Sequence, residues 1–288
     1  MKPTFIKPLV NQRQANALEG EFLTRLHYRE LAQADVPYID DESGKLVCLL
    51  VKQCLPADVC QQAYEHLRTV SKLPNNRGIA VAGKGAMMPG LTKDGSLSSR
   101  NEIPRPVWEA AGKPLADFLG FFDYRDVNDK RKLNCRETEW TGTHRAVYEA
   151  ALPLICEINS VFRDCLPFEY AAQLDEVRKV PDDLKIAGTA FTTVTVNKNL
   201  RTACHRDEGD LLQGTGCMAT LGQWQGSELV IPQFGLAVNY QPGDLLLGDV
   251  HLWHGNAPFV EGGERVTTVL YCRERMHECG SDSGEDNR

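Results

Sequence analysis

Two histidines and an aspartate in the C-terminal third of the chain have the residue types of a metal site. His205 and Asp207 are one residue apart, so on an extended segment both side chains point to the same side. The third ligand must come from another strand, where His251 and His254 are the candidates, and we prefer His254. We interpret His251 as a core residue or a support for the ligands. Two histidines and one carboxylate leave positions open on Fe(II), as in non-haem iron oxygenases.

A strand-like segment beyond the second histidine begins at Arg265, which suits an anionic co-substrate. The keto-acid end of 2-oxoglutarate can fill two open positions on such an iron, and O2 can take the third. The far carboxylate then needs a fixed cation, and an arginine provides a two-pronged contact that a lysine does not reproduce. Thr267 faces the same side and adds a hydroxyl donor. The pattern predicts Fe(II) and 2-oxoglutarate as cofactors, against the alternative of a surface His205–Asp207 pair and an Arg265 salt bridge.

Short strands must position these groups, and the sequence after Pro181 has the pattern expected of such strands. Apolar and β-branched runs are separated by Gly, Pro and Asn at roughly even spacing, which is typical of a sandwich or barrel. We therefore predict an α+β fold with a double-stranded β-helix, or jelly-roll, core over about residues 181–276. The expected strands are Phe191–Val196, Met218–Leu221, Glu228–Ile231, Leu236–Val238, Asp244–Leu247 and Arg265–Tyr271.

The N-terminal half, about residues 1–180, is predicted to be a helical scaffold packed on this core. One helix begins near Pro56 with apolar residues at helical spacing, and residues 75–104 are expected to form a long loop. No internal repeat or linker is apparent, so we expect one catalytic domain that ends in a disordered acidic tail, residues 277–288. The other expected elements are a strand, Leu46–Val51, and helices near Pro106–Leu119 and His144–Cys165.

Composition narrows the class of protein. No apolar run approaches the ~18 residues that span a bilayer, and the first residues lack the apolar stretch of a secretory signal. We therefore expect a soluble, intracellular protein, nuclear in a eukaryote and cytoplasmic in a bacterium or phage. The ten cysteines form no CxxC pair, which argues against a zinc site and a disulfide framework and favours reduced, buried thiols.

The net charge of −7 argues against a positive electrostatic potential over the whole surface, which a nucleic-acid-binding protein commonly has. Any DNA binding would need local basic patches. Each candidate, taken alone, is better explained as an ordinary solvated charge. The candidates for phosphate contact are Lys198, Arg201 and Arg206 near the site, with Arg100 and Arg105 in the long loop region.

Several segments together resemble the TET/JBP family, the ten-eleven-translocation and J-binding-protein oxygenases. The resemblance is strong over residues 191–276 and looser upstream. The animal TET proteins carry a long cysteine-rich zinc-binding domain that is missing here, so we expect the N-terminal half to supply the DNA-gripping surface. The segments are Asn197–Asp207, Gly226–Pro232, Pro242–Asp249, His254–Asn256 and Arg265–Met276, with Gly83–Asn101 and Cys135–Thr138 more loosely.

Members of this family oxidise the methyl group of 5-methylcytosine or thymine in DNA. By this resemblance His205, Asp207 and His254 are the iron ligands. Arg265 and Thr267 match the residues that hold 2-oxoglutarate. A methyl group stacked inside a duplex must leave the helix to reach an enzyme's metal, so the resemblance implies a flipped base as substrate.

Three positions bear on the base. Tyr271 matches the TET tyrosine that stacks on the flipped base, with a core tyrosine as the alternative. Asp210 and Arg273 fall where TET enzymes carry a base-contacting asparagine and histidine, and these departures leave the choice of base open. Asp210 is a natural acceptor for a cytosine amino group, which favours cytosine, although a solvated turn residue is its alternative.

The resulting hypothesis is oxidation of a 5-methylpyrimidine in DNA, chiefly 5-methylcytosine to 5-hydroxymethylcytosine and higher oxidation states. Thymine hydroxylation on DNA is the alternative within the family. Hydroxylation of a free nucleobase, a peptide or a small metabolite is a second alternative, favoured by the acidic balance and the missing zinc domain. A catalytically silent binding module is the alternative from a different class.

Overall fold

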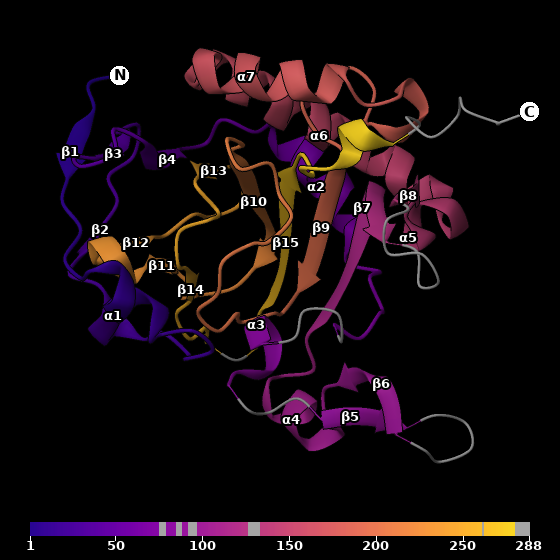
Figure 1. The fold of residues 1–288 in the computed structure, drawn as a ribbon, viewed down its shortest axis with the longest axis horizontal. Coiled ribbons are helices and arrows are strands. Elements are labelled where there is room, and N and C mark those ends of the chain that lie inside the picture. Colours follow the sequence, from indigo (N-terminus) through magenta and orange to yellow (C-terminus); the bar gives the residue numbers. More distant parts are fainter. Residues whose placement is uncertain (75–78, 85–87, 92–96, 126–132, 261, 280–288) are drawn as a thin grey trace, which may run out of the picture.

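A mixed nine-stranded sheet forms the centre of the molecule (Figure 1). The computed structural model describes residues 1–74, 79–84, 88–91, 97–125, 133–260 and 262–279. The strand order of this sheet is β1-β3-β4-β13-β10-β15-β9-β7-β8, and a second sheet has the order β14-β11-β12-β2. The strands are β1 (Thr4–Ile6), β2 (Glu30–Leu31), β3 (Tyr38–Asp40), β4 (Leu46–Val51), β5 (Met88–Leu91), β6 (Leu97–Glu102), β7 (Leu115–Arg125), β8 (Leu133–Glu137), β9 (Thr193–Lys198), β10 (Gly216–Gln223), β11 (Leu229–Ile231), β12 (Leu236–Val238), β13 (Leu245–Gly248), β14 (Gly255–Asn256) and β15 (Glu264–Tyr271).

Helices cover one face of the large sheet. Apolar residues of α2 and α6 pack against the inward residues of β9, β10 and β15 in the largest core cluster, which includes Phe162, Val196 and Val266. Figure 1 shows α6 and α7 together above the sheet, while β5, β6 and α4 project from the opposite side. In the described part of the chain, no helix has the length and apolar character that a membrane crossing requires. The helices are α1 (Gln12–Asn16), η1 (Arg25–His27), α2 (Ala57–Leu67), α3 (Ile79–Ala82), α4 (Arg105–Ala110), α5 (Glu139–Thr143), α6 (Arg145–Cys165), α7 (Pro167–Arg178), η3 (Asp182–Leu184), η4 (Pro232–Phe234) and η5 (Met276–Glu278).

The other face of the large sheet packs on the small sheet. A second core cluster joins Leu50, Met218 and Leu246 of the large sheet to Leu236 and Val238 of the small one. A jelly-roll core consists of two facing sheets, and along each strand every second side chain points between them. Six expected strands correspond to β9, β10, β11, β12, β13 and β15, shifted by at most a few residues, and β4 agrees with its expected bounds.

The expectation of a helical N-terminal half is not confirmed, because five strands of the large sheet come from that half. The clearest error concerns the segment expected to be one helix up to Leu119. Here α4 ends early, because Gly112 and Lys113 adopt φ of +81° and +55° and Pro114 follows. The aromatic-rich segment beyond Pro114 then forms β7, which pairs with β9. The expected long loop also contains β5 and β6, which pair as a hairpin.

The C-terminal end departs from expectation as well. Cys279 forms a disulfide with Cys135 of β8, so these two cysteines are not the reduced thiols that the sequence suggested. Met276–Glu278 form η5, and the buried Met276 packs with Cys279. The expected disordered tail therefore does not include these residues, and residues 280–288 lie outside the described part of the chain. The other eight cysteines are free thiols.

A buried carboxylate, Asp244, ties the turn before β13 to the end of β4. It accepts hydrogen bonds from the Lys52 ammonium, the backbone and side chain of Gln53, and the backbone of Gln241. Burial alone raises the pKa of Asp244, but these donors together hold it below the ordinary value. The negative charge of Asp244 therefore stabilises the folded state.

We expect Asp244→Asn to lower the free energy of unfolding by about 1.5–3 kcal/mol at pH 7, because several donors lose a charged acceptor. A carboxyl with a depressed folded pKa stabilises above its unfolded pKa of ~3.9, and that stability is lost as pH falls through the folded value. Urea unfolding at several pH values should show the difference from wild type shrinking in acid below about pH 4. Asp182→Asn, at an exposed ion pair, is the matched control. A difference that persists unchanged in acid would contradict this account.

Candidate active site

A cavity of about 780 Å³ is lined by one face of β9 and β15 and by parts of β7, β11 and the segment before β10. Alternate residues of β9 and β15 line it, whereas the residues between them, such as Val196 and Val266, pack into the helix-covered core. Its size is within the range of small-molecule and cofactor sites. From these two strands the lining residues are Thr193, Thr195, Asn197, Arg265, Thr267, Val269 and Tyr271.

His205, Asp207 and His254 converge at this cavity. The segments that carry the two histidines exchange backbone hydrogen bonds, each amide donating to the other residue's carbonyl at 2.9 Å. One ligand atom from each of the three side chains lies within 4.8 Å of the others. The Nε2 atom of His205 is 3.5 Å from Asp207 Oδ1, and the Nε2 atom of His254 is 4.0 Å from Asp207 Oδ2. Three atoms with this spacing can share one metal ion on a single side.

The hydrogen bonds of both rings favour metal binding. His205 Nδ1 lies 2.8 Å from the Ala203 carbonyl, and His254 Nδ1 lies 2.9 Å from the Leu252 carbonyl. Because a carbonyl only accepts, each Nδ1 must carry the proton, which leaves the Nε2 lone pair free for a metal. Burial, together with the nearby His205, lowers the pKa of His254 to about 4. The His254 ring is therefore neutral at pH 7, as a ligand must be.

His251, the other candidate from the sequence, lies outside this group. Its Nδ1 atom pairs with Asp249 Oδ1 at 3.0 Å, and its Nε2 atom lies 3.4 Å from the Asp210 carbonyl. The hydrogen bond that His251 donates to the Asp249 carboxylate raises the pKa of His251. These contacts tie His251 to the loop that carries Asp207 and Asp210.

Arg265 and Thr267 meet the requirements for holding a carboxylate. Arg265 is 3% exposed and donates through Nη2 to the Tyr240 hydroxyl at 2.9 Å, while its Nε has no hydrogen-bond partner among the described residues. Thr267 Oγ1 and Asn197 Oδ1 are likewise buried without a partner, on paired positions of β15 and β9. Buried polar atoms left without partners cost free energy. Of these atoms, Arg265 Nε and Thr267 Oγ1 can donate to a ligand in the cavity, which fits an anionic, oxygen-rich ligand such as 2-oxoglutarate.

The side of the cavity away from Arg265 carries the residues expected to contact a base. Tyr271 lines the cavity, and its hydroxyl lies 3.2 Å from Thr195 Oγ1. Asp210 is 7% exposed and pairs through its backbone with Arg273, so it is not the solvated turn residue of the alternative interpretation. The guanidinium of Arg273 binds Asp123 of β7. The three residues named from the sequence thus share one wall, to which β7 also contributes.

The expected phosphate contacts divide into two kinds. Lys198 pairs with Glu264, and Arg201 donates to the Leu23 and Asn256 carbonyls, so both have structural partners. Arg206 is exposed at the cavity, with its guanidinium 4.7 Å from the centre of the Trp253 ring. Arg105 is exposed and pairs with Glu109. The side chain of Arg100 lies outside the described residues.

The sequence interpretation missed several lining residues, of which Thr195, Asn197, Tyr240 and Asp123 matter most to the site. Thr195 belongs to the expected strand Phe191–Val196 and Asn197 follows it directly, so the alternation of that strand could have indicated that both line the cavity. Tyr240 precedes the Pro242–Asp249 segment and carries no sequence signal of its contact with Arg265. Asp123 was missed because β7 was expected to begin as a helix.

The family model and the curated relatives that match this chain point to the same family. The TET/JBP family model, described as the oxygenase domain of the 2OGFeDO superfamily, matches residues 117–274. Thymine dioxygenase JBP1 of Leishmania infantum is 29% identical over 249 residues, 84% of this chain and 26% of that protein. Thymine dioxygenase JBP1 of Trypanosoma brucei brucei is 36% identical over 172 residues, 57% of this chain and 20% of that protein. The chain therefore spans about a quarter or less of the length of these relatives.

A solved structure supports the same fold. The structure of NgTET1 in complex with 5mC DNA superimposes with a TM-score of 0.55 at 12% sequence identity, covering 92% of each chain. At this identity the likeness concerns the fold alone. It agrees with the sheet-rich α+β architecture of jelly-roll type described above.

Proposed function

We propose that this chain, which belongs to the TET/JBP family of Fe(II)- and 2-oxoglutarate-dependent oxygenases, oxidises the methyl group of a 5-methylpyrimidine in DNA. One observation carries the proposal: a single cavity combines a His-Asp-His group, a buried arginine with unsatisfied polar neighbours, and an aromatic ring. The first two features suit iron and 2-oxoglutarate, and the third suits a flat substrate.

In this proposal His205, Asp207 and His254 hold the iron through two Nε2 atoms and a carboxylate oxygen. Arg265 and Thr267 hold the far carboxylate of 2-oxoglutarate, with Tyr240 fixing the arginine fork. Iron and 2-oxoglutarate, when bound, supply the oxidising power to insert an oxygen atom from O2 into a C–H bond. The protein's own contribution is to orient the methyl group and to keep bulk water away from the site.

Tyr271 is the proposed platform for the base. Its ring lies on the same face of β15 as Arg265 and Thr267, and the hydrogen bond with Thr195 restrains its orientation. Stacking on an aromatic ring stabilises a flipped base by ~1–3 kcal/mol, which offsets part of the cost of unstacking it. The exposed Arg206, supported by Trp253, is the proposed contact for a flanking phosphate.

Different observations favour the two candidate bases. Asp210 brings an acceptor to the cavity, and a carboxylate is a suitable partner for the amino group of 5-methylcytosine. Our main hypothesis is therefore 5-methylcytosine, oxidised to 5-hydroxymethylcytosine and beyond. The relatives named thymine dioxygenase favour thymine as the alternative, since they resemble this chain at 29–36% identity.

The experiment that tests the proposed function measures how DNA stimulates 2-oxoglutarate consumption. Matched oligonucleotides would carry 5-methylcytosine, cytosine, thymine or uracil at one position in otherwise thymine-free DNA. We expect succinate formation to rise only with an oligonucleotide that carries a 5-methyl group. Equal stimulation by cytosine and 5-methylcytosine, and by uracil and thymine, would exclude methyl oxidation.

Replacing Tyr271 separates stacking from oxidation. We expect Tyr271→Ala to reduce DNA turnover by about 5- to 150-fold, the loss that corresponds to one base-stacking contact. Slow consumption of 2-oxoglutarate without DNA should remain, because the proposed iron and co-substrate residues are intact. Tyr271→Phe retains the ring and should be mild. If the Phe variant loses as much activity as the Ala variant, the hydroxyl and not stacking is responsible.

A further inference from the structure

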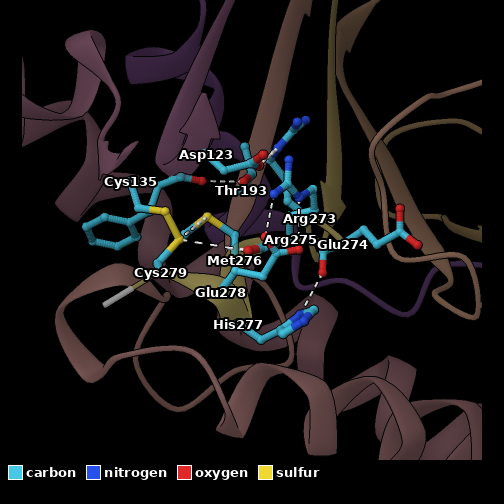
Figure 2. The surroundings of a disulfide bond; sticks show 11 residues. Asp123, Cys135, Thr193, Arg273, Glu274, Arg275, Met276, His277, Glu278 and Cys279 are labelled. Atoms are coloured by element: carbon cyan, nitrogen blue, oxygen red, sulfur yellow. Dashed lines mark hydrogen bonds and ion pairs between the residues drawn. A yellow bond between two sulfur atoms is a disulfide. The ribbon is translucent and has the colours of Figure 1, made fainter. Parts of the chain in front are cut away.

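Two ties fasten the segment after β15 to the β7–β8 hairpin. The Cys135–Cys279 disulfide joins β8 to the residue that follows η5. The second tie is the Arg273–Asp123 ion pair, in which Nε of the guanidinium donates to Oδ1 of the carboxylate at 2.5 Å. Figure 2 shows Asp123 and Arg273 pointing toward one another on the same side of the hairpin as the disulfide. Residues 272–279, here called the C-terminal segment, therefore have two fixed points on β7 and β8.

The ion pair is enclosed and faces the cavity. The side chains of Asp123 and Arg273 are 10% and 23% exposed, and both line the cavity. The Arg273 backbone amide donates to Thr192 Oγ1 at 3.0 Å, and this hydrogen bond fixes the backbone from which the side chain extends. The terminal nitrogens of Arg273 are confined as well. Nη2 packs so closely on Gly209 that a Cβ added to this glycine would lie only 3.0 Å from it. The guanidinium is thus held between β7 and the loop that carries Asp207 and Asp210.

These contacts fix the orientation of the Arg273 guanidinium. Asp123 accepts from Nε, and the terminal nitrogens lie beside Gly209, on the loop that carries Asp207 and Asp210. An arginine only donates, and it therefore suits a carbonyl oxygen on the edge of a pyrimidine. Without the carboxylate, a long side chain of this kind regains several rotamers, and the contact becomes entropically more costly.

We propose that Asp123 is a positioning residue that aims Arg273 at the edge of the substrate base, and that the Cys135–Cys279 disulfide holds the C-terminal segment in place for this contact. The inference rests on the proposed function, since it assigns the specificity-determining wall of that same site. Asp123 acts through Arg273, whereas the disulfide acts through the backbone of the segment.

A double-mutant cycle tests the role of Asp123. We expect Asp123→Ala to raise the KM for methylated DNA by about tenfold, the lower end of the loss for a hydrogen bond to a charged group. It should also change the ratio of 5-methylcytosine to thymine turnover. Asp123→Asn retains an acceptor and should restore part of the loss. In an Arg273→Ala background, Asp123→Ala should have no further effect.

The matched control is Glu278→Gln. Glu278 pairs with Arg275 in the same C-terminal segment, and neither residue lines the cavity. This variant should leave the KM and the base preference as in wild type. Thermal melting of every variant identifies any that are merely unstable, and Asp123→Asn then provides the milder substitution for the kinetic comparison.

The disulfide is tested in the same assay. Cys135→Ser with Cys279→Ser should raise the KM for DNA, by less than Asp123→Ala does. A dithiol transfers two electrons to the S–S bond, leaving two cysteine thiols and a cyclic disulfide of the reagent. Treated wild type should therefore match the double-serine variant, and that variant should not respond. Its lack of response also controls for any action of the dithiol on iron.

Each outcome decides a different claim. If wild type is active on DNA but Asp123→Ala leaves the KM and the base preference unchanged, the role of Asp123 is wrong. Additive losses in the Arg273→Ala background would mean that Asp123 acts on the fold and not through Arg273. An identical KM for wild type, treated wild type and the double-serine variant would remove the disulfide from the account. If wild type oxidises no base in DNA, the proposed function falls, and this inference falls with it.

Discussion

Asp207→Ala and His254→Ala are expected to lose more than about 100-fold in iron affinity, because even changes outside the ligand set cost 10- to 100-fold. Turnover at ordinary iron concentrations should then be undetectable. The physical reason is that two remaining ligands do not define one side of the metal. Asp207 also approaches both histidine rings, so its loss would leave two neutral groups and no charge to balance the cation. Equilibrium dialysis of Fe(II) and an activity assay measure the two effects separately.

His251→Ala is the matched control for these variants. His251 is three residues from His254 in the chain and pairs with Asp249, so it tests whether any histidine in this loop is essential. We expect it to bind iron and to retain substantial activity. An inactive His251→Ala together with an active His254→Ala would show that the ligands were assigned wrongly.

Arg265→Lys is expected to raise the KM for 2-oxoglutarate by about 10- to 150-fold, the loss that corresponds to a hydrogen bond to a charged group. Lysine keeps the positive charge but cannot form the two-pronged contact or reach Tyr240 in the same way. Iron affinity measured without co-substrate should change little. Tyr240→Phe should raise the same KM to a smaller extent, because Arg265 retains its charge and loses only one fixed point.

Arg201→Lys is the control for the arginine-to-lysine change. Arg201 donates to backbone carbonyls and does not line the cavity, so its replacement should leave the KM for 2-oxoglutarate as in wild type. An unchanged 2-oxoglutarate dependence of Arg265→Lys would remove Arg265 from this role. Equal effects of the two variants would point to general destabilisation.

The expected strands agree best with the structure where candidate site residues occupy every second position of a strand. On β15, Arg265, Thr267 and Tyr271 were expected on one face from the period of two, and all three line the cavity. The same rule on β9 accounts for Thr195 and Asn197. In these strands, the residues between the lining ones pack against the helices, so the face that each residue adopts follows from local sequence alone.

Long-range pairing accounts for what the sequence did not predict. The segment that forms β7 is apolar enough for a helix, and its pairing with β9 and β8 favours the extended form. Asp123 belongs to that strand, so its contact with Arg273, 150 residues further on, could not be foreseen. The disulfide joins residues 144 positions apart, and cysteine spacing in the sequence gives no indication of such a pair.

The proposed site of oxidation is the methyl group of a pyrimidine in DNA. Mass spectrometry of nucleosides from digested DNA, after incubation with the protein, Fe(II), 2-oxoglutarate and O2, tests it most directly. We predict hydroxymethyl, formyl or carboxyl pyrimidine from methylated or thymine-containing DNA, and none with Asp207→Ala. Absence of every oxidised base from DNA, while a free nucleoside or a peptide gains a hydroxyl group, would contradict the DNA assignment and leave only the oxygenase chemistry.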